Sequence, residues 1–393
     1  MKEVFIVSAV RTPQGSFGGA FASLSATQLG STAIKGALEK AGVEASHVEE
    51  VFFGNVCSAG LGQAPARQAA LGAGLGENVP CTTVNKVCAS GMKSIMFAAQ
   101  SIMLGYGDLL VAGGMESMSN IPYYNTKVRW GSKYGDISLI DGLAYDGLRD
   151  AYSHTAMGIS GDTTASKYDI SREEQDRYAI RSYKAAAAAT ESGAFKEEIV
   201  PVSVPQRRKD PILVSEDEEY KKVRFDKIPT LRAAFTKDGT VTAANASTLN
   251  DGASALILAS AAKVKELGLT PIAKIVSFAD AAHSPEFFTT APTLAAPIAL
   301  KRAGMTMNDI DYFEVNEAFA VVPLAFNKML NIDEDKVNVY YQLLPLLSGD
   351  EVEKFHKTAK NLCKKSKNTQ WLNKIEFGYG KFLELHNQNE AIE

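Results

Sequence analysis

The sequence predicts an α/β protein with two related halves and one inserted block. Between Val4 and Gly114, short apolar runs alternate with segments of helical periodicity, which is typical of a sheet covered by helices on both faces. Residues 118–249 lack this alternation and contain more aromatic, charged and turn-forming residues. A helix–glycine–strand segment of the first half recurs near residue 300, which indicates an internal duplication.

The elements of the first half follow one another closely. An apolar run predicts a buried strand over Val4–Val10. The amphipathic run Thr27–Ala41 predicts a helix that ends at Gly42, because glycine readily adopts the left-handed conformation of a helix C-terminus. Three further strands are expected at 48–56, 79–85 and 108–115, with a long apolar helix before the last.

The inserted block and the repeat give two more local predictions. Ser171 and Glu174 fit a capping box, which predicts a helix that continues into the alanine run 185–189. The repeat aligns Ala37–Asn55 with Ala299–Glu317 at a constant offset of 262 residues. We expect each copy to form a helix, a glycine stop and a buried strand that ends in an Asn-containing turn.

Composition excludes several classes of function. The chain has 393 residues, and at about 150 residues per domain this suggests two or three units. A net charge of −4 provides no basic field, so we expect no nucleic-acid partner. No run approaches the roughly 18 apolar residues of a transmembrane helix, so we expect no membrane partner. The N-terminus lacks a leader pattern, which predicts a cytoplasmic protein and leaves the mitochondrial matrix open.

Cys88 is the strongest candidate for a reactive side chain. Apolar residues follow it at helical spacing from Met92 to Met103, which places Cys88 on a strand-to-helix turn. Free N–H groups and the helix dipole at such a turn lower the pKa of a thiol and favour the nucleophilic thiolate. The alternative is a buried structural cysteine, since unpaired cysteines are often buried. We assign that core role to Cys57 and Cys81.

Three weaker patterns each have a structural alternative. Asn316 and Glu317 close an apolar strand, where α/β folds place active-site groups, although strand-end asparagines are often turn formers. The small residues of Gly239–Ser254 allow a ligand to approach the backbone, or a helix to pack tightly on a sheet. A basic cluster could bind phosphates or face solvent, and it consists of Lys221, Lys222, Arg224 and Lys227.

Six motifs in this order resemble the thiolase family. They are VSAVRTPQGSF, GQAPARQAALGAGL, NKVCASGMKSIM, VAGGMESMSN, GTVTAANASTLNDGA and VNEAFA. The resemblance covers about residues 1–340 and is strongest to the acetoacetyl-CoA thiolase (acetyl-CoA acetyltransferase) branch. It implies a duplicated αβαβα layered fold, an acyltransferase activity through an acyl-cysteine, and a homodimer or homotetramer. The thiolase form of NKVCASGMKS argues against a ketosynthase with the same duplicated fold.

The resemblance also implies a domain organisation. Residues 1–117 with about 250–271 would form the first half, and 118–249 the CoA-binding loop domain. Residues 272–340 would start the second half, and 341–393 would be an atypical tail.

Functional residues are implied by the same resemblance. Cys88 would accept the acetyl group from acetyl-CoA, and its backbone N–H would face the acyl oxygen. Asn316 would hold a water that stabilises the enolate oxygen formed on the way to acetoacetyl-CoA. The residues implied for CoA binding are Leu148, Met157, Tyr183, Lys222, Arg224, Lys227, Ala243 and Ser247. No cofactor besides CoA as substrate is implied, apart from a potassium ion held by Tyr183, Ala243, Ala244 and Ala246.

The family pattern stops near residue 340. The resemblance implies a GHP histidine and a C-x-G cysteine, and neither tripeptide occurs in the chain. We therefore expect an incomplete second half and a tail derived from a frameshift, a splice variant or a misassembled gene. The alternative function is a catalytically impaired thiolase-like chain that binds CoA or pairs with intact subunits.

Overall fold

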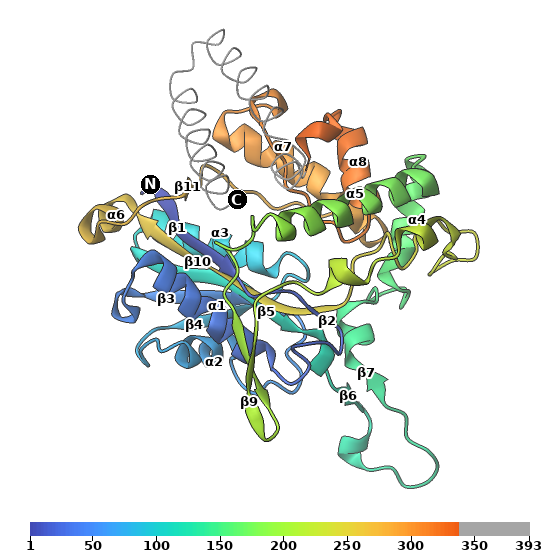
Figure 1. The fold of residues 1–393 in the computed structure, drawn as a ribbon, viewed down its shortest axis with the longest axis horizontal. Coiled ribbons are helices and arrows are strands. Elements are labelled where there is room, and N and C mark those ends of the chain that lie inside the picture. The colour runs from blue at the N-terminus through green and yellow to red at the C-terminus, as the bar shows by residue number, and fades with distance from the viewer. Residues whose placement is uncertain (338–393) are drawn as a thin grey trace, which may run out of the picture. The chain divides into compact units, whose positions relative to one another are not determined.

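The computed structural model describes residues 1–337, and these residues build one seven-stranded mixed sheet (Figure 1). The strand order is β11–β1–β10–β5–β3–β4, with β2 paired beside β10. Strands β3, β4 and β5 are parallel to one another, whereas β10 runs antiparallel to both β1 and β5. The strands are β1 (Val4–Arg11), β2 (Gly15–Ser16), β3 (Glu50–Gly54), β4 (Cys81–Val84), β5 (Leu109–Ser117), β10 (Asn250–Ser260) and β11 (Ala273–Lys274).

Helices cover both faces of this sheet. Helices α1 (Ala26–Ala41) and α2 (Pro65–Gly72) pack on one face, and α3 (Ser90–Leu104) packs on the other. Strand β5 shows why both faces are apolar, because its side chains alternate between them. Leu109 and Val111 belong to the cluster of α1, whereas Leu110 and Ala112 belong to that of α3. The predicted sheet with helices on both faces is confirmed.

Helix α3 is also the one described helix that is long and apolar enough to cross a membrane. The segment that is long and apolar enough is Val87–Leu104, and this statement rests on length and composition only. A buried core helix meets it as well, and Ala98, Ala99 and Ile102 of α3 pack fully buried against the sheet.

Local capping signals predicted the helix ends well. Helix α1 begins at Ala26, one residue before the predicted start, with Ser25 and Gln28 forming a capping box. It ends at Gly42, whose φ of 64° is left-handed as expected. Helix α5 (Arg172–Glu191) begins after Ser171, which accepts a hydrogen bond from the Glu174 N–H.

The inserted block is mainly helical and irregular, as predicted. Its two short sheets, β6–β7 and β8–β9, are separate from the main sheet. Its elements are β6 (Tyr123–Tyr124), β7 (Ile140–Asp141), α4 (Met157–Lys167), α5, β8 (Val202–Gln206) and β9 (Lys209–Val214). After the block, β10 returns to the main sheet between β1 and β5.

The second half preserves part of the predicted repeat. Helix α7 (Ala291–Ala303) ends at left-handed Gly304, as α1 ends at Gly42. The short 3₁₀ helices Ala45–His47 and Met307–Asp309 also lie at the repeat offset. Helix α8 (Val321–Leu330) also belongs to this half, whereas α6 (Ala261–Leu267) packs against β1 and β10 of the main sheet.

The buried strand predicted before Asn316 is wrong within the described residues. A strand forms where neighbouring backbones supply hydrogen-bond partners. In the first copy, β3 pairs with β4 and β5. In the second copy, the described chain offers a single bridge between Phe313 and Val337. The predicted tail, residues 341–393, lies outside the described residues.

Candidate active site

Cys88 occupies the turn between β4 and α3, as predicted. Helix α3 begins two residues later at Ser90, and its N-cap residue Ala89 makes no side-chain capping bond. Cys88 is exposed, which argues against a buried structural role. Cys57, by contrast, is buried and Cys81 is partly buried, in agreement with their predicted core roles.

The expected lowering of the Cys88 pKa is wrong. Withdrawal of the thiol from water by the surrounding protein raises its pKa, and the opposing effect is a hydrogen bond from the residue's own N–H. Two cations flank the turn, but Lys86 and Lys93 both bind the carboxylate of Asp280. Neither lysine is among the groups that shift the Cys88 pKa, and desolvation is the largest effect at the sulfur.

Glycines lie where α3 comes close to the sheet, and one of them, Gly54, has no room for a side chain. A Cβ on Gly54, at the end of β3, would lie 2.8 Å from the Gly91 nitrogen and the Ser90 carbonyl carbon. On Gly114, in β5, it would lie 3.4 Å from the Gly91 Cα. Sequence reasoning missed this role, for which the available signal was a pair of glycines inside the predicted strand 108–115. The glycines fix the position of the Cys88 turn.

The segment with Asn316 docks against the small-residue loop predicted to approach a ligand. The Ser247 N–H donates to the Ala318 carbonyl at 2.9 Å, and the Ala320 N–H donates to the Asn245 carbonyl at 2.8 Å. Asn316 itself is exposed. The structure thus brings together two motifs that lie about 70 residues apart in the sequence.

Asn245 is the buried anchor of that loop. Its amide donates to the Asp176 carboxylate at 2.9 Å and to the Thr240 carbonyl at 3.0 Å. Its Oδ1 accepts from the Thr242 N–H at 2.8 Å. Sequence reasoning missed Asn245, although an asparagine inside a run of alanines and serines marks a polar group with a specific partner.

Helix α5 fixes the other side of the Asn316 segment. The hydroxyls of Tyr178 and Ser182 donate to the two carboxylate oxygens of Glu317, at 2.7 and 2.6 Å. Burial raises the pKa of Tyr183, and the charges of Glu219 and Glu317 add to the effect. Tyr183 therefore lies close to both carboxylates.

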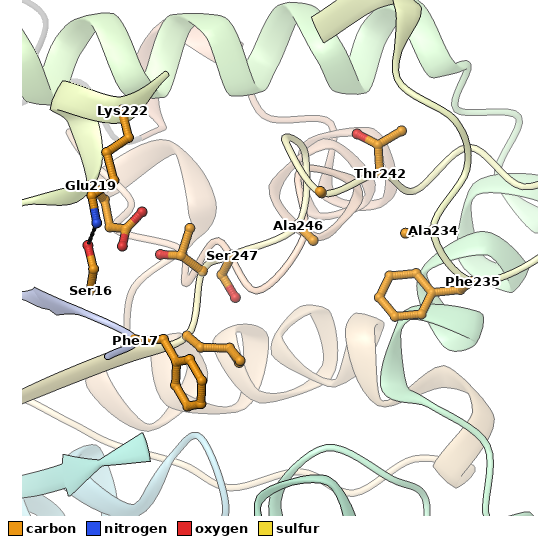
Figure 2. A pocket seen from close by; sticks show the side chains of 12 residues that line it. Ser16, Phe17, Glu219, Lys222, Ala234, Phe235, Thr242, Ala246 and Ser247 are labelled. Carbon is orange, nitrogen blue, oxygen red and sulfur yellow. Dashed lines mark hydrogen bonds between the residues drawn. The ribbon is translucent and has the colours of Figure 1, made fainter. Parts of the chain in front are cut away.

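A cavity of about 460 Å³ opens beside the small-residue loop (Figure 2). This volume is within the usual range for small-molecule sites. Lys222, Glu219 and Ser16 lie toward one end, with a hydrogen bond from the Lys222 ammonium to the Ser16 hydroxyl, and Phe235 lies toward the other. The lining residues are Ser16, Phe17, Glu219, Lys222, Ala234, Phe235, Thr242, Ala243, Ala246, Ser247, Thr248 and Leu249.

The cavity contains some of the residues predicted to bind CoA and excludes others. Lys222, Ala243 and Ser247 line it. The predicted residues outside its lining are Leu148, Met157, Tyr183, Arg224, Lys227, Cys88 and Asn316.

The predicted residues outside the cavity occupy several places. Leu148 and Met157 are both half-buried and adjacent, since the Met157 N–H donates to the Leu148 carbonyl at 3.1 Å. Arg224 and Lys227 are exposed near the 3₁₀ helix Phe225–Thr230.

Oxygen atoms suited to a potassium ion are present in the loop. Among the described residues, no hydrogen bond is made to the carbonyl oxygens of Ala243, Ala244 and Ala246. Hard monovalent cations take such oxygens as ligands. The described part of the chain contains no group of three or more His, Cys, Asp or Glu residues placed to hold a metal ion.

Two family models match the chain. The thiolase N-terminal domain matches residues 4–262, and the thiolase C-terminal domain matches residues 269–342. The chain therefore belongs to the thiolase family, and the predicted thiolase fold is confirmed.

Named relatives match the same part of the chain. An acetyl-CoA acetyltransferase of Schizosaccharomyces pombe is 60% identical over 338 residues, which are 86% of each chain. The human mitochondrial acetyl-CoA acetyltransferase is 55% identical over 340 residues, which are 86% of this chain and 79% of the relative. A crystal structure of the Acat5 thiolase from Ascaris suum in complex with coenzyme A superimposes with a TM-score of 0.82 at 46% identity, covering 86% of this chain and 87% of the other.

Proposed function

We propose that this chain is an acetyl-CoA C-acetyltransferase, which joins two acetyl-CoA molecules into acetoacetyl-CoA or carries out the reverse thiolysis. The observation that carries the proposal is the exposed Cys88 at the start of α3, within a chain 60% identical to a relative named for this activity. Covalent catalysis divides the transfer into two easier steps.

In the first step the Cys88 thiolate attacks the thioester carbonyl of acetyl-CoA. A bond forms between Sγ and the carbonyl carbon, the bond from that carbon to the CoA sulfur breaks, and CoA leaves as a thiolate. The Cys88 N–H is proposed to stabilise the acyl oxygen, an oxyanion-hole role. The raised thiol pKa means that a base or a raised pH must supply the thiolate.

In the second step the methyl group of another acetyl-CoA loses a proton, which in the net reaction ends on the CoA thiolate released in the first step. The carbanion attacks the carbonyl carbon of the acetyl-cysteine. Acetoacetyl-CoA forms and the Cys88 thiolate leaves. Asn316 is proposed to hold the water that stabilises the enolate oxygen. Its exposure in a segment fixed by Glu317 and by the Ala318–Ser247 contact supports this role.

CoA is proposed to bind along the cavity and the residues beside it. Lys222 provides positive charge for phosphate groups, and Ala243 and Ser247 provide a small-residue wall for the pantetheine chain. Leu148, Met157, Tyr183, Arg224 and Lys227 would extend the site beyond the cavity. A potassium ion would be held by the Tyr183 hydroxyl and the carbonyls of Ala243, Ala244 and Ala246, where it would order the loop.

Assembly and location are part of the proposal. We propose a homodimer or homotetramer in the cytoplasm, without nucleic-acid or membrane partners. Relatives named as cytosolic and as mitochondrial both match the chain at 55–56% identity, so both compartments stay open.

A catalytically impaired, CoA-binding chain is the second candidate. It is favoured by the missing GHP and C-x-G tripeptides and by the raised pKa of Cys88. Loss of a catalytic base costs roughly 10²–10⁴-fold in rate.

Thiolysis of acetoacetyl-CoA by CoA distinguishes the two candidates. The assay compares the chain, its C88A variant, and a version that carries a GHP-containing family C-terminus. Turnover that depends on Cys88 in the unmodified chain supports the acetyltransferase. CoA binding without turnover, together with turnover in the restored version, supports the impaired chain, and no turnover in either version contradicts the acetyltransferase.

A further inference from the structure

One side chain ties the Cys88 turn to the neighbouring strand end. Asn85 directly follows β4, and its Nδ2 donates to the Val56 carbonyl at 3.1 Å. Its Oδ1 accepts a hydrogen bond from the Val87 N–H at 3.0 Å. Val56 follows β3, the parallel neighbour of β4, and its own N–H donates to half-buried Glu116 at 2.9 Å. Asn85 therefore joins the turn to a loop that is anchored independently.

The residue that Asn85 holds has an unusual backbone. Val87 has a φ of 48°, in the left-handed region that a β-branched side chain disfavours. Such a conformation persists where the surroundings fix it, and it occurs preferentially at functional sites. Asn85 binds the N–H of Val87, and the Ser90 hydroxyl donates to its carbonyl at 2.6 Å. Both polar backbone groups of Val87 are thus hydrogen-bonded to side chains of neighbouring residues.

The direction of the chain at Val87 determines where the Cys88 amide points. The backbone amide of Cys88 lowers the pKa of its own thiol against the larger effect of desolvation, so this amide favours the thiolate. Among the described residues, the lysines of the turn and of the first turn of α3, Lys86 and Lys93, both bind Asp280. A change of backbone direction at Val87 would therefore leave the sulfur without a compensating donor.

We propose that Asn85 is a positioning residue of the acyl-transfer site, which holds Val87 in the left-handed conformation that orients Cys88. This inference rests on the proposed role of Cys88 as the acyl acceptor. Asn85 acts through the backbone and does not touch the reacting atoms.

The test is the rate of Cys88 alkylation by iodoacetamide, followed by peptide mass spectrometry from neutral to alkaline pH. The variants are N85A, V87G and the double variant. N125A is the matched control, because Asn125 makes the same kind of clamp between the Ser138 carbonyl and the N–H groups of Lys127 and Val128. We expect N85A to slow alkylation roughly fivefold at neutral pH, the effect of one lost hydrogen bond, and to move the midpoint of the profile upward.

The double variant separates positioning from a merely structural role. Glycine adopts a positive φ without a steric penalty, so the hydrogen bond from the residue 87 N–H to Asn85 is expected to matter less in V87G. We expect N85A to slow alkylation less than twofold in the V87G background and N125A to have no effect. An unchanged rate in N85A, or the same loss in both backgrounds, would overturn the proposal. Labelling of buried Cys57 reports unfolding, and where N85A shows it, N85L replaces N85A in the same comparison, because leucine has about the size of asparagine and lacks the acceptor for the Val87 N–H.

Failure of the proposed function would give a different result from failure of the positioning role of Asn85. Wild-type Cys88 that is alkylated but never acetylated by acetyl-CoA contradicts the acetyltransferase. The alkylation rates of N85A, V87G and the double variant would still decide the role of Asn85.

Discussion

Replacement of Gly54 by alanine tests how the Cys88 turn is positioned. The added Cβ would lie 2.8 Å from backbone and Cβ atoms of Ser90 and Gly91, whereas ordinary van der Waals contact begins at 3.4 Å. The first turn of α3 must therefore move by about 0.6 Å, because no flexible side chain can give way. Overpacking of this kind costs about 1–3 kcal/mol of the free energy of unfolding.

Two measurements follow the effect of G54A. We expect urea denaturation to show that loss of stability, and iodoacetamide to alkylate Cys88 about tenfold more slowly, since small displacements of a reacting group reduce rates strongly. The matched control is G252A, in β10 of the same sheet, where a Cβ meets its nearest atom at 3.5 Å. Wild-type stability and alkylation in G54A, or equal losses in G252A, would refute the positioning role of Gly54.

Three further predictions concern the cavity, the loop and the thiol. The K222A substitution, which removes the Lys222 ammonium, is expected to weaken CoA binding roughly two- to fivefold in calorimetry. The difference should shrink at high salt, because the side chain is exposed. An effect independent of salt argues against a phosphate contact. N245A is expected to lower the free energy of unfolding by about 1–3 kcal/mol and to weaken CoA binding, since it removes the amide that donates to Asp176 and to the Thr240 carbonyl. Unchanged urea denaturation would show that the loop does not depend on this amide. Because desolvation favours the neutral thiol, alkylation of Cys88 is expected to rise with pH to a midpoint above that of an ordinary cysteine, and a midpoint below neutrality would contradict this prediction.

Features encoded by neighbouring residues could be predicted from the sequence. The capping box at Ser171, the stop at Gly42 and the helix that begins after Cys88 each depend on a few adjacent side chains. The family motifs extended this reading to the thiolase fold. Alternating apolar runs predicted the sheet because a strand buried on both faces needs apolar residues throughout.

Features that depend on distant partners could not be predicted in the same way. The strand expected before Asn316 has the right residues, but the described chain provides one bridge beside it. The pKa of Cys88 is raised by desolvation, which depends on the packing around the thiol in the folded chain and not on sequence spacing. The contact between Gly54 and α3 is likewise a tertiary packing relation that sequence spacing does not reveal.

Acyl transfer to Cys88 is the central claim, and one measurement tests it most directly. The chain is incubated with isotopically labelled acetyl-CoA, digested, and the peptide that contains Cys88 is analysed by mass spectrometry, with C88S as the control. The account predicts one labelled acetyl group on Cys88 and none on the C88S peptide. An unlabelled Cys88, or label that persists on the same peptide in C88S, would contradict it.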